Sequence, residues 1–337
     1  MVNQSDDRPA LVVEDAVEPE LPICDPHHHF WDRDVHRGGD RYLLDELTQD
    51  LSGGHNVTHT VFIECRSMYR AQGPEELRSV GETEFVQGIA AQSASGNYGP
   101  TAVAAGIVSN ANLMLGAAVE PVLEAHLAAS GNRFRGIRFS CAWDASPEVG
   151  SPGSNAPGML LDSRFREGFA CLQKLGLSFD ALVYHTQLEE LADLADAFPD
   201  ATIILNHIGR PLGIGPYSGK GAEVFDAWQE GITAVAQRAN VLVKLGGFGN
   251  PISGYGWHQR PIPPSSTELV ETITPWLMFC IEQFGPERCM FESNFPVDKA
   301  SYNYTAVWNA FKLVSQGFSA SERAAMFQGT AVKAYRL

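Results

Sequence analysis

The sequence predicts a single α/β domain in which eight parallel strands form a (β/α)8 barrel. Short apolar, β-rich runs alternate with longer amphipathic stretches along almost the whole chain, and such alternation implies parallel strands joined by helices. Eight strand-like runs can be counted, and 337 residues suffice for one large barrel. Two long loops follow expected strands, on the side where a barrel carries its active site.

Most of the expected strands are short runs of Val, Ile, Phe, Leu or Thr bounded by polar or turn residues. In chain order they are residues 21–24, 58–64, 101–108, 134–139, 177–184, 201–206, 240–245 and 288–292. The stretches between them carry apolar residues at helical spacing. The expected helices are residues 42–51, 74–93, 115–129, 165–175, 188–198, 223–238, 267–284, 304–315 and 320–335.

An N-terminal arm and two long loops complete this plan. Residues 1–20 are expected to be an arm that is either flexible or lies on the barrel, and the barrel takes residues 21–337. The loop at 140–158 is rich in Gly, Ser and Pro, and the loop at 248–265 carries Trp257 and His258. Long loops in a compact domain are usually functional, so we expect both to cover the C-terminal rim of the barrel.

Composition and charge argue against several classes of function. Hydrophobic residues make up 44% of the chain, and no apolar run reaches the roughly 18–20 residues that span a bilayer. A formal charge of −16 argues against nucleic acid and anionic membranes as partners. The acidic N-terminus lacks the features of a secretory signal, and the six cysteines form no CxxC pair. We therefore expect a cytoplasmic protein with free thiols, and a homo-oligomer is left open.

Polar side chains stand where the expected strands end. His27 and His29 follow the first strand, and strand alternation places them on one face and His28 on the other. The later strand ends supply Glu64, Arg138, His185, His207, Lys244, Glu292, Asn294 and, in the loop that follows, Asp298. Apolar packing does not explain this set, and barrel enzymes carry their active sites at this rim. We therefore predict the active site here.

The other histidines and the aromatic residues near the rim can be explained by structural roles as well as by substrate contact. His36, His55, His59 and His126 are expected to be surface or satisfied core groups, whereas His258 is an open candidate for substrate contact. Aromatic side chains near the rim suit a planar or ring-shaped ligand, although barrel loops also use them for packing. They are Phe30, Trp31, Trp143, Phe248 and Trp257. There is no GxGxxG or GxxxxGK[ST] motif, so we expect no organic cofactor.

Five stretches carry a resemblance to a known family. They are DPHHHFWD (25–32), RGIR (135–138), NHIGRP (206–211), VKL (243–245) and MFESNFPV (290–297). With them the chain resembles the amidohydrolase superfamily over roughly residues 21–335. The resemblance is to its lactonase-like branch, which includes pyrone dicarboxylate lactonase, sulfomuconolactone hydrolase and the sugar-acid lactonases. The combination is specific to the superfamily and a poor guide to the substrate.

The resemblance implies a hydrolase that opens a small cyclic ester. The family's HxH pair falls on His27 and His29, its fifth-strand histidine on His185 and its sixth-strand histidine on His207. Together with one carboxylate, the first three of these would hold one Zn²⁺ or another divalent metal. Members of the branch that work without metal use an acid to activate water while histidines polarise the carbonyl. Both routes stay open.

The last strand departs from the family pattern. Members usually carry Asp where this chain has Asn294, and an amide cannot act as a base. Glu292, on the same strand face, or Asp298, four residues further on, would take over beside His207 as catalytic groups. We favour Asp298 because we expect it to be exposed, whereas a buried Glu292 could instead pair with Lys244 or Arg138.

The expected substrate contacts are Arg138, Asn294, Lys244, Trp31 and Trp257. Arg138 suits a bidentate grip on a substrate carboxylate, and its alternative role is a structural ion pair with Glu64 or Glu292. The substrate is expected to be a small molecule, either a carboxylated or a ring-shaped lactone. Two other functions stay open: a decarboxylase or hydratase of the same barrel family, and a non-catalytic ligand-binding barrel, which Asn294 suggests.

Overall fold

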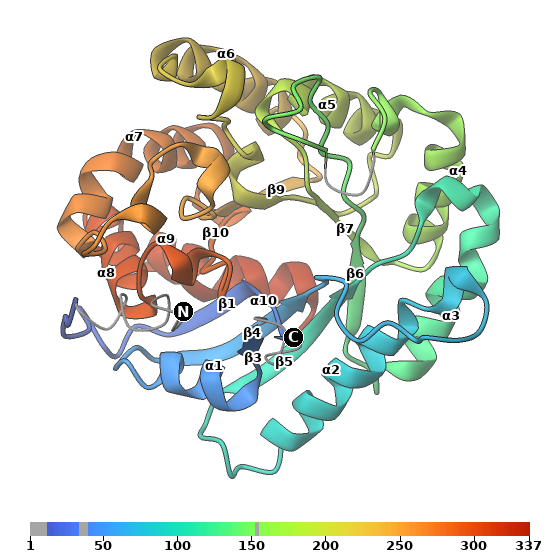
Figure 1. Cartoon of the computed structure of the whole chain (residues 1–337), viewed down its shortest axis with the longest axis horizontal. Helices are drawn as coiled ribbons and strands as arrows, with labels where there is room; N and C mark the ends of the chain where they lie inside the picture. Colours follow the sequence, from blue (N-terminus) through green and yellow to red (C-terminus); the bar gives the residue numbers. More distant parts are fainter. Residues whose placement is uncertain (1–11, 34–39, 152–154) are drawn as a thin grey trace, which may run out of the picture.

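The predicted barrel is confirmed by a computed structural model, which describes residues 12–33, 40–151 and 155–337. Eight parallel strands form one sheet in the order β1-β4-β5-β6-β7-β8-β9-β10. Their bounds are Ile23–His28 (β1), Val57–Ile63 (β4), Ala102–Ser109 (β5), Phe134–Arg138 (β6), Ser178–Ala181 (β7), Ile203–Leu205 (β8), Val241–Leu245 (β9) and Cys289–Phe291 (β10). Figure 1 shows these strands in the middle of the molecule with the larger helices around them.

Helices follow the strands and cover the outside of the barrel. Their bounds are Leu44–Leu51 (α1), Val80–Ser93 (α2), Glu120–Ala129 (α3), Ser163–Lys174 (α4), Leu188–Ala197 (α5), Gly221–Ala236 (α6), Ser266–Phe284 (α7), Tyr304–Val314 (α8), Ala320–Ala324 (α9) and Thr330–Tyr335 (α10). Side-chain caps begin several of them, as where Asp162 accepts from two amides of α4 and Ser265 forms a capping box with Glu268 on α7. None of the helices in the described ranges is long and apolar enough to cross a membrane.

The differences from the expected elements are local. β1 continues beyond its expected end at Cys24 as far as His28, so the histidine stretch lies largely inside the strand. A short antiparallel pair, Trp31–Asp32 (β2) with Arg41–Tyr42 (β3), was not expected. The helix expected at 320–335 is divided into α9 and α10 by a π-helical turn over Ala325–Gly329.

The barrel closes between β1 and the segment that follows β10. The amide of Asn294 donates to the carbonyl of His27 at 3.0 Å, and the amide of His29 donates to the carbonyl of Phe295 at 2.8 Å. The Asp25 carboxylate accepts the amide of Ser293 at 3.1 Å. This closure sets the histidine stretch directly against the end of the last strand.

Strand alternation separates the barrel interior from its helix-covered face. Val61 and Ile63 of β4 pack in one cluster with Met290 of β10 and Tyr335 of α10, whereas Phe62 packs in another cluster. His28 lies with Phe62, and its Nε2 is 2.8 Å from Thr60 Oγ1. The prediction that His28 points away from its two neighbours is therefore confirmed.

The described part of the N-terminal arm lies along α8. Lys312 donates to the carbonyls of Val17 at 2.9 Å and Glu18 at 2.8 Å. Asn309 donates to the Glu14 carboxylate at 3.1 Å. Residues 1–11 and His36, for which we also made predictions, lie outside the described residues.

Candidate active site

Three buried side chains from three strand ends meet in the barrel mouth. His27 lies near the end of β1, His207 in a 3₁₀ turn (Asn206–Gly209) directly after β8, and Glu292 directly after β10. Glu292 Oε1 is 2.7 Å from His207 Nδ1, and Glu292 Oε2 is 2.7 Å from His27 Nδ1. One potential ligand atom from each of the three residues lies within 4.8 Å of the other two.

This cluster has the properties of a divalent-metal site. His207 Nε2 is buried and has no hydrogen-bond partner among the described residues, and Glu292 Oε2 makes no aligned hydrogen bond there, although His27 Nδ1 lies 2.7 Å from it. Buried polar atoms are normally paired, so the unpaired His207 Nε2 beside a carboxylate points to a ligand site. Two imidazoles and a carboxylate are a donor set that suits Zn²⁺. The three residues therefore fit a divalent cation.

Burial sets the charge of these groups. It holds the pKa of His27 well below the usual range, with the charge of Lys244 acting in the same direction. The pKa of His207 is likewise lowered, by burial first and by Arg210 next. Burial raises the pKa of Glu292 to about 7, against the opposing charge of Lys244. Both rings are therefore neutral at pH 7 and keep a lone pair for a metal or a proton.

A left-handed turn presents His207. Four consecutive residues have positive φ angles: His207 at 54°, Ile208 at 50°, Gly209 at 77° and Arg210 at 44°. Such conformations are costly for residues other than glycine and persist where the surroundings hold them. Here the amide of His207 donates to Glu292 Oε1 at 3.0 Å, and Trp228 Nε1 donates to the carbonyl of Ile208 at 2.6 Å. The turn is therefore fixed with His207 facing Glu292.

Two cations flank His27, and each has its own carboxylate. Lys244 Nζ, on β9, lies 3.3 Å from His27 Nδ1 and donates to Asp180 at 2.7 Å. Arg138 Nη1, at the end of β6, lies 3.2 Å from His27 Nε2, and its Nε donates to Glu64 at 2.8 Å. Of the roles left open for Arg138, the structure contains the ion pair with Glu64.

His29 faces the site beside Asn294. Its Nδ1 is 2.7 Å from the carbonyl of Ile63, which can only accept, so the proton of the neutral ring is on Nδ1 and Nε2 keeps its lone pair. Nε2 is 3.4 Å from Asn294 Oδ1, and Asn294 Nδ2 donates to Asp298 Oδ1 at 2.7 Å. Asn294 is therefore hydrogen-bonded to Asp298, whereas its Oδ1 and His29 Nε2 are two acceptors that form no hydrogen bond while the ring is neutral.

The expectation that Asp298 is the exposed carboxylate is wrong. Asp298 and Glu292 are both 0% exposed. Asp298 lies at the start of a 3₁₀ turn (Asp298–Ala300), and its Oδ2 accepts from Tyr302 at 2.5 Å and from the amide of Gly249 at 3.0 Å. Burial raises its pKa to about 7. The two acids therefore differ in their partners, and Glu292 is the one that contacts the histidines.

His185 stands apart from the three-residue cluster. It begins a 3₁₀ turn (His185–Gln187) after β7, and its ring meets that of Tyr217 edge-on at 5.3 Å. Its Nδ1 is buried without a partner among the described residues, and burial lowers its pKa to about 4. Metal binding by His29 and His185 stays a prediction.

The tryptophans predicted to contact substrate are mostly buried. Trp31 donates to Asp40 at 2.9 Å, and Trp257 stacks on Tyr255 with ring centres 4.5 Å apart. These contacts agree with a packing role, and substrate contact stays a prediction for both.

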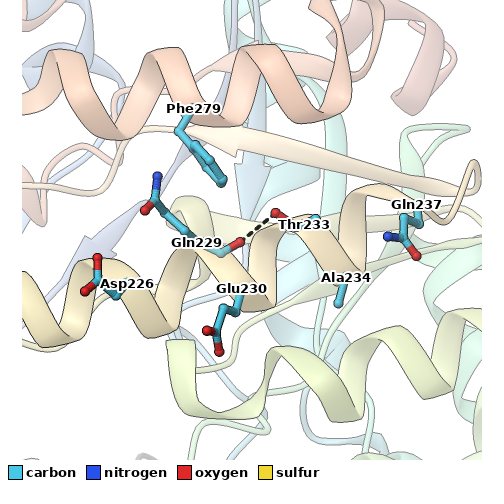
Figure 2. A pocket seen from close by; sticks show the side chains of 7 residues that line it. All are labelled: Asp226, Gln229, Glu230, Thr233, Ala234, Gln237 and Phe279. Carbon is cyan, nitrogen blue, oxygen red and sulfur yellow. Dashed lines mark hydrogen bonds between the residues drawn. The ribbon is translucent and has the colours of Figure 1, made fainter.

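A separate hollow lies on the outer surface between α6 and α7 (Figure 2). Its volume is about 700 Å³. The lining side chains are Asp226, Gln229, Glu230, Thr233, Ala234, Gln237 and Phe279. It shares no residue with the histidine cluster and is separate from the site in the barrel mouth.

Comparison with known proteins identifies the family. The model of the amidohydrolase family matches residues 24–337. The chain belongs to the amidohydrolase family. This confirms the resemblance that the sequence motifs indicate, including the lactonase-like branch, since curated lactonases are among the relatives.

Three known proteins show the range of similarity to this amidohydrolase. An uncharacterized protein, y4mH, from Sinorhizobium fredii is 31% identical over 94% of this chain and 99% of its own length. The L-fucono-1,5-lactonase of Burkholderia multivorans is 25% identical over 61% of this chain and 64% of its own length. The crystal structure of a Burkholderia multivorans amidohydrolase with bound zinc shares the fold, with a TM-score of 0.71, 22% identity, and coverage of 94% of this chain and 99% of that one.

The structure of this amidohydrolase also draws attention to residues that sequence reasoning missed. Asp180 anchors Lys244, and its place within an apolar strand was the available signal. Arg210 follows His207 in the same turn, and its buried Nε has no partner among the described residues. Glu82, in the first turn of α2, is 0% exposed, and only its position on an apolar helix face could have shown this.

The residues expected to be structural have ordinary partners. His126 Nδ1 is 2.8 Å from Thr83 Oγ1, and His55 Nδ1 is 2.8 Å from Lys312 Nζ. The cysteines are free, and all are buried except the half-buried Cys65. These groups stabilise the fold of this amidohydrolase and lie outside the histidine cluster.

Proposed function

We propose that this amidohydrolase hydrolyses a small lactone, with His27, His207 and Glu292 as its reaction centre. The observation that carries the proposal is the buried cluster of two neutral imidazoles and one carboxylate at strand ends, in which His207 Nε2 has no partner among the described residues. The relation to lactonases supports the choice of a cyclic ester as substrate. Arg210 beside the cluster supports a lactone that carries an anionic group.

Lactone opening requires a proton to move from water to the leaving oxygen. Water attacks the carbonyl carbon and loses its proton, and the ring C–O bond then breaks. The acceptor is the Glu292–His207 pair: a proton on His207 Nε2 places a positive ring 2.7 Å from the Glu292 carboxylate. The same proton passes to the ring oxygen as it leaves, and the product is a hydroxy acid.

A divalent cation offers the alternative route in the same cluster. His27, His207 and Glu292 would hold it, and Zn²⁺ there would polarise the carbonyl and lower the pKa of water. Arg138 and Lys244 are each neutralised by a carboxylate. A bound cation would therefore not face two uncompensated positive charges.

The test combines a substrate panel with elemental analysis of purified protein. We expect acid release from at least one sugar-acid or carboxylated lactone, with no CO₂ release, and a loss of about 10³-fold in kcat/KM for His207→Asn. One equivalent of metal in the wild type that is absent from His27→Ala supports the cation route. Release of CO₂ from aromatic acids without lactone turnover would establish the decarboxylase alternative instead.

A further inference from the structure

We propose that Glu82 is a positioning residue for the reaction, which acts through Glu64 and Arg138 on His27. The proposal rests on lactone hydrolysis at the cluster that contains His27. Glu82 lies at the third position of α2 and is 0% exposed. It touches none of the cluster residues, so its effect must pass through the groups between them.

Glu82 fixes the segment that follows β4. Its Oε1 accepts the amide of Cys65 at 3.0 Å and the amide of Ser67 at 2.7 Å. Arg66, between them, has a φ of 62°, which turns both amides toward one oxygen. Helix α2 packs tightly against the same segment, since a Cβ on Gly81 would lie 2.6 Å from the carbonyl oxygen of Met68.

That segment begins at Glu64, which sets the orientation of Arg138. Glu64 Oε1 accepts Arg138 Nε at 2.8 Å, and the carbonyl of Glu64 accepts Arg138 Nη2. Two contacts fix a planar guanidinium in one orientation. The remaining arm, Nη1, then lies 3.2 Å from His27 Nε2. A shift of residues 65–67 would therefore move the cation that faces a ring of the reaction centre.

Charge gives Glu82 a second effect. The groups that face it are the carboxylate of Glu64, the guanidinium of Arg138, the thiol of Cys65 and the phenol of Tyr69. Burial, and next the charge of Glu64, raise the pKa of Glu82 to about 8. Below that pH one carboxylate faces Arg138, and above it two carboxylates compete for the same cation and weaken its contact with His27.

Two substitutions of Glu82 separate positioning from bulk stability. In the wild type we expect kcat to fall as the pH rises through about 8. In Glu82→Gln the amide oxygen still accepts both amides, so we expect kcat at pH 7 within about twofold of wild type. This variant should not show the fall in kcat near pH 8. In Glu82→Ala both amides lose their acceptor, and we expect kcat to fall about tenfold to a hundredfold with KM nearly unchanged. Glu190→Gln is the matched control, because Glu190 is also an acid at the third position of a barrel helix, α5.

The positioning role of Glu82 can be contradicted by kinetics or by crystal structures. A fall in kcat near pH 8 that persists in Glu82→Gln would overturn the proposal. A wild-type kcat in Glu82→Ala would overturn it as well. If the wild type opens no lactone, the proposed function fails, and crystal structures still test the positioning. An Arg138 Nη1 to His27 Nε2 contact kept at 3.2 Å in Glu82→Ala would contradict it. If Glu82→Ala does not fold, wild-type crystals at pH 6.5 and 9.5 replace it, and an unchanged contact there counts equally against the proposal.

Discussion

We propose Arg210 as the residue whose charge bears most directly on substrate choice. It follows His207 in the left-handed turn, and its pKa is lowered by burial first and by the charge of Arg138 next. Arg138 is paired with Glu64, so we propose that Arg210 binds a substrate carboxylate, while the same role for Arg138 stays a prediction. An anionic group on the substrate would relieve the repulsion between the two guanidinium groups.

Replacing Arg210 should therefore distinguish charged from neutral substrates. For Arg210→Met we expect KM for a carboxylated lactone to rise about tenfold, which corresponds to about 1.4 kcal/mol, with kcat within about twofold. KM for neutral lactones should change little, whereas any change in kcat through the pKa of His207 should be the same for both classes of substrate. Arg238→Met, which breaks an ion pair with Asp196 at the outer surface, serves as the control. An equal rise in KM for neutral and charged lactones would contradict this role.

Single residues also mark where sequence reasoning reaches its limit. That His27 and His28 point to opposite faces of β1 follows from strand geometry alone and could be predicted. The exposure of Asp298 could not, because it depends on Tyr302 and Gly249, which only the folded loops bring to it. Which acid faces the histidines is decided by this tertiary packing.

At the level of elements, the end of β9 makes room for the reaction centre. A Cβ on Gly246 would lie 2.6 Å from Glu292 Cγ, and a Cβ on Gly247 would lie 2.5 Å from His207 Cγ. Both distances are too short for any side chain. The pair Gly246–Gly247 therefore lets two residues of the cluster approach the neighbouring strand end.

A methyl group at Gly247 should displace His207. For Gly247→Ala we expect kcat/KM to fall about a hundredfold or more, because a shift of about 1 Å in a catalytic group has effects of that size. Gly176→Ala is the matched control, since Gly176 also has a positive φ, 64°, but its Cβ would meet nothing within 4 Å. Kinetics and thermal unfolding of both variants check this. Equal losses of activity in the two variants would mean that backbone strain, and not displacement of His207, causes the effect.

Element existence was easier to predict than element detail. All eight strands could be predicted from short apolar runs, because parallel strands that are buried on both faces consist mostly of apolar residues. The left-handed turn at residues 207–210 gives no such signal, because three of its four positive-φ residues are not glycine. The turn is held by Glu292 and Trp228, which are distant in sequence.

Across the whole molecule, buried titratable groups make stability depend on pH. Burial lowers the pKa of His126 from 6.5 to about 4. The unfolded chain therefore takes up a proton below pH 6.5 that the folded chain refuses until about pH 4, so stability present above pH 6.5 is lost as the pH falls through this window.

The loss attributable to His126 can be measured by urea unfolding at pH 7.5 and pH 5. At pH 5 this histidine should cost about 2 kcal/mol relative to pH 7.5. His126→Gln should be less stable at pH 7.5 and show a smaller difference between the two pH values. His59→Gln, at a half-buried histidine, should retain most of the difference. An undiminished pH dependence in His126→Gln would contradict the assignment.

The reaction centre itself is tested most directly by kcat/KM of Glu292→Gln on the best lactone of the panel. The amide keeps the shape of the side chain but removes the charge that lies 2.7 Å from both His27 and His207. We predict a fall of about 10³-fold or more, about 4 kcal/mol of transition-state stabilisation, with an unchanged fold and with Glu190→Gln close to wild type. Activity within about threefold of wild type would show that the chemistry lies elsewhere.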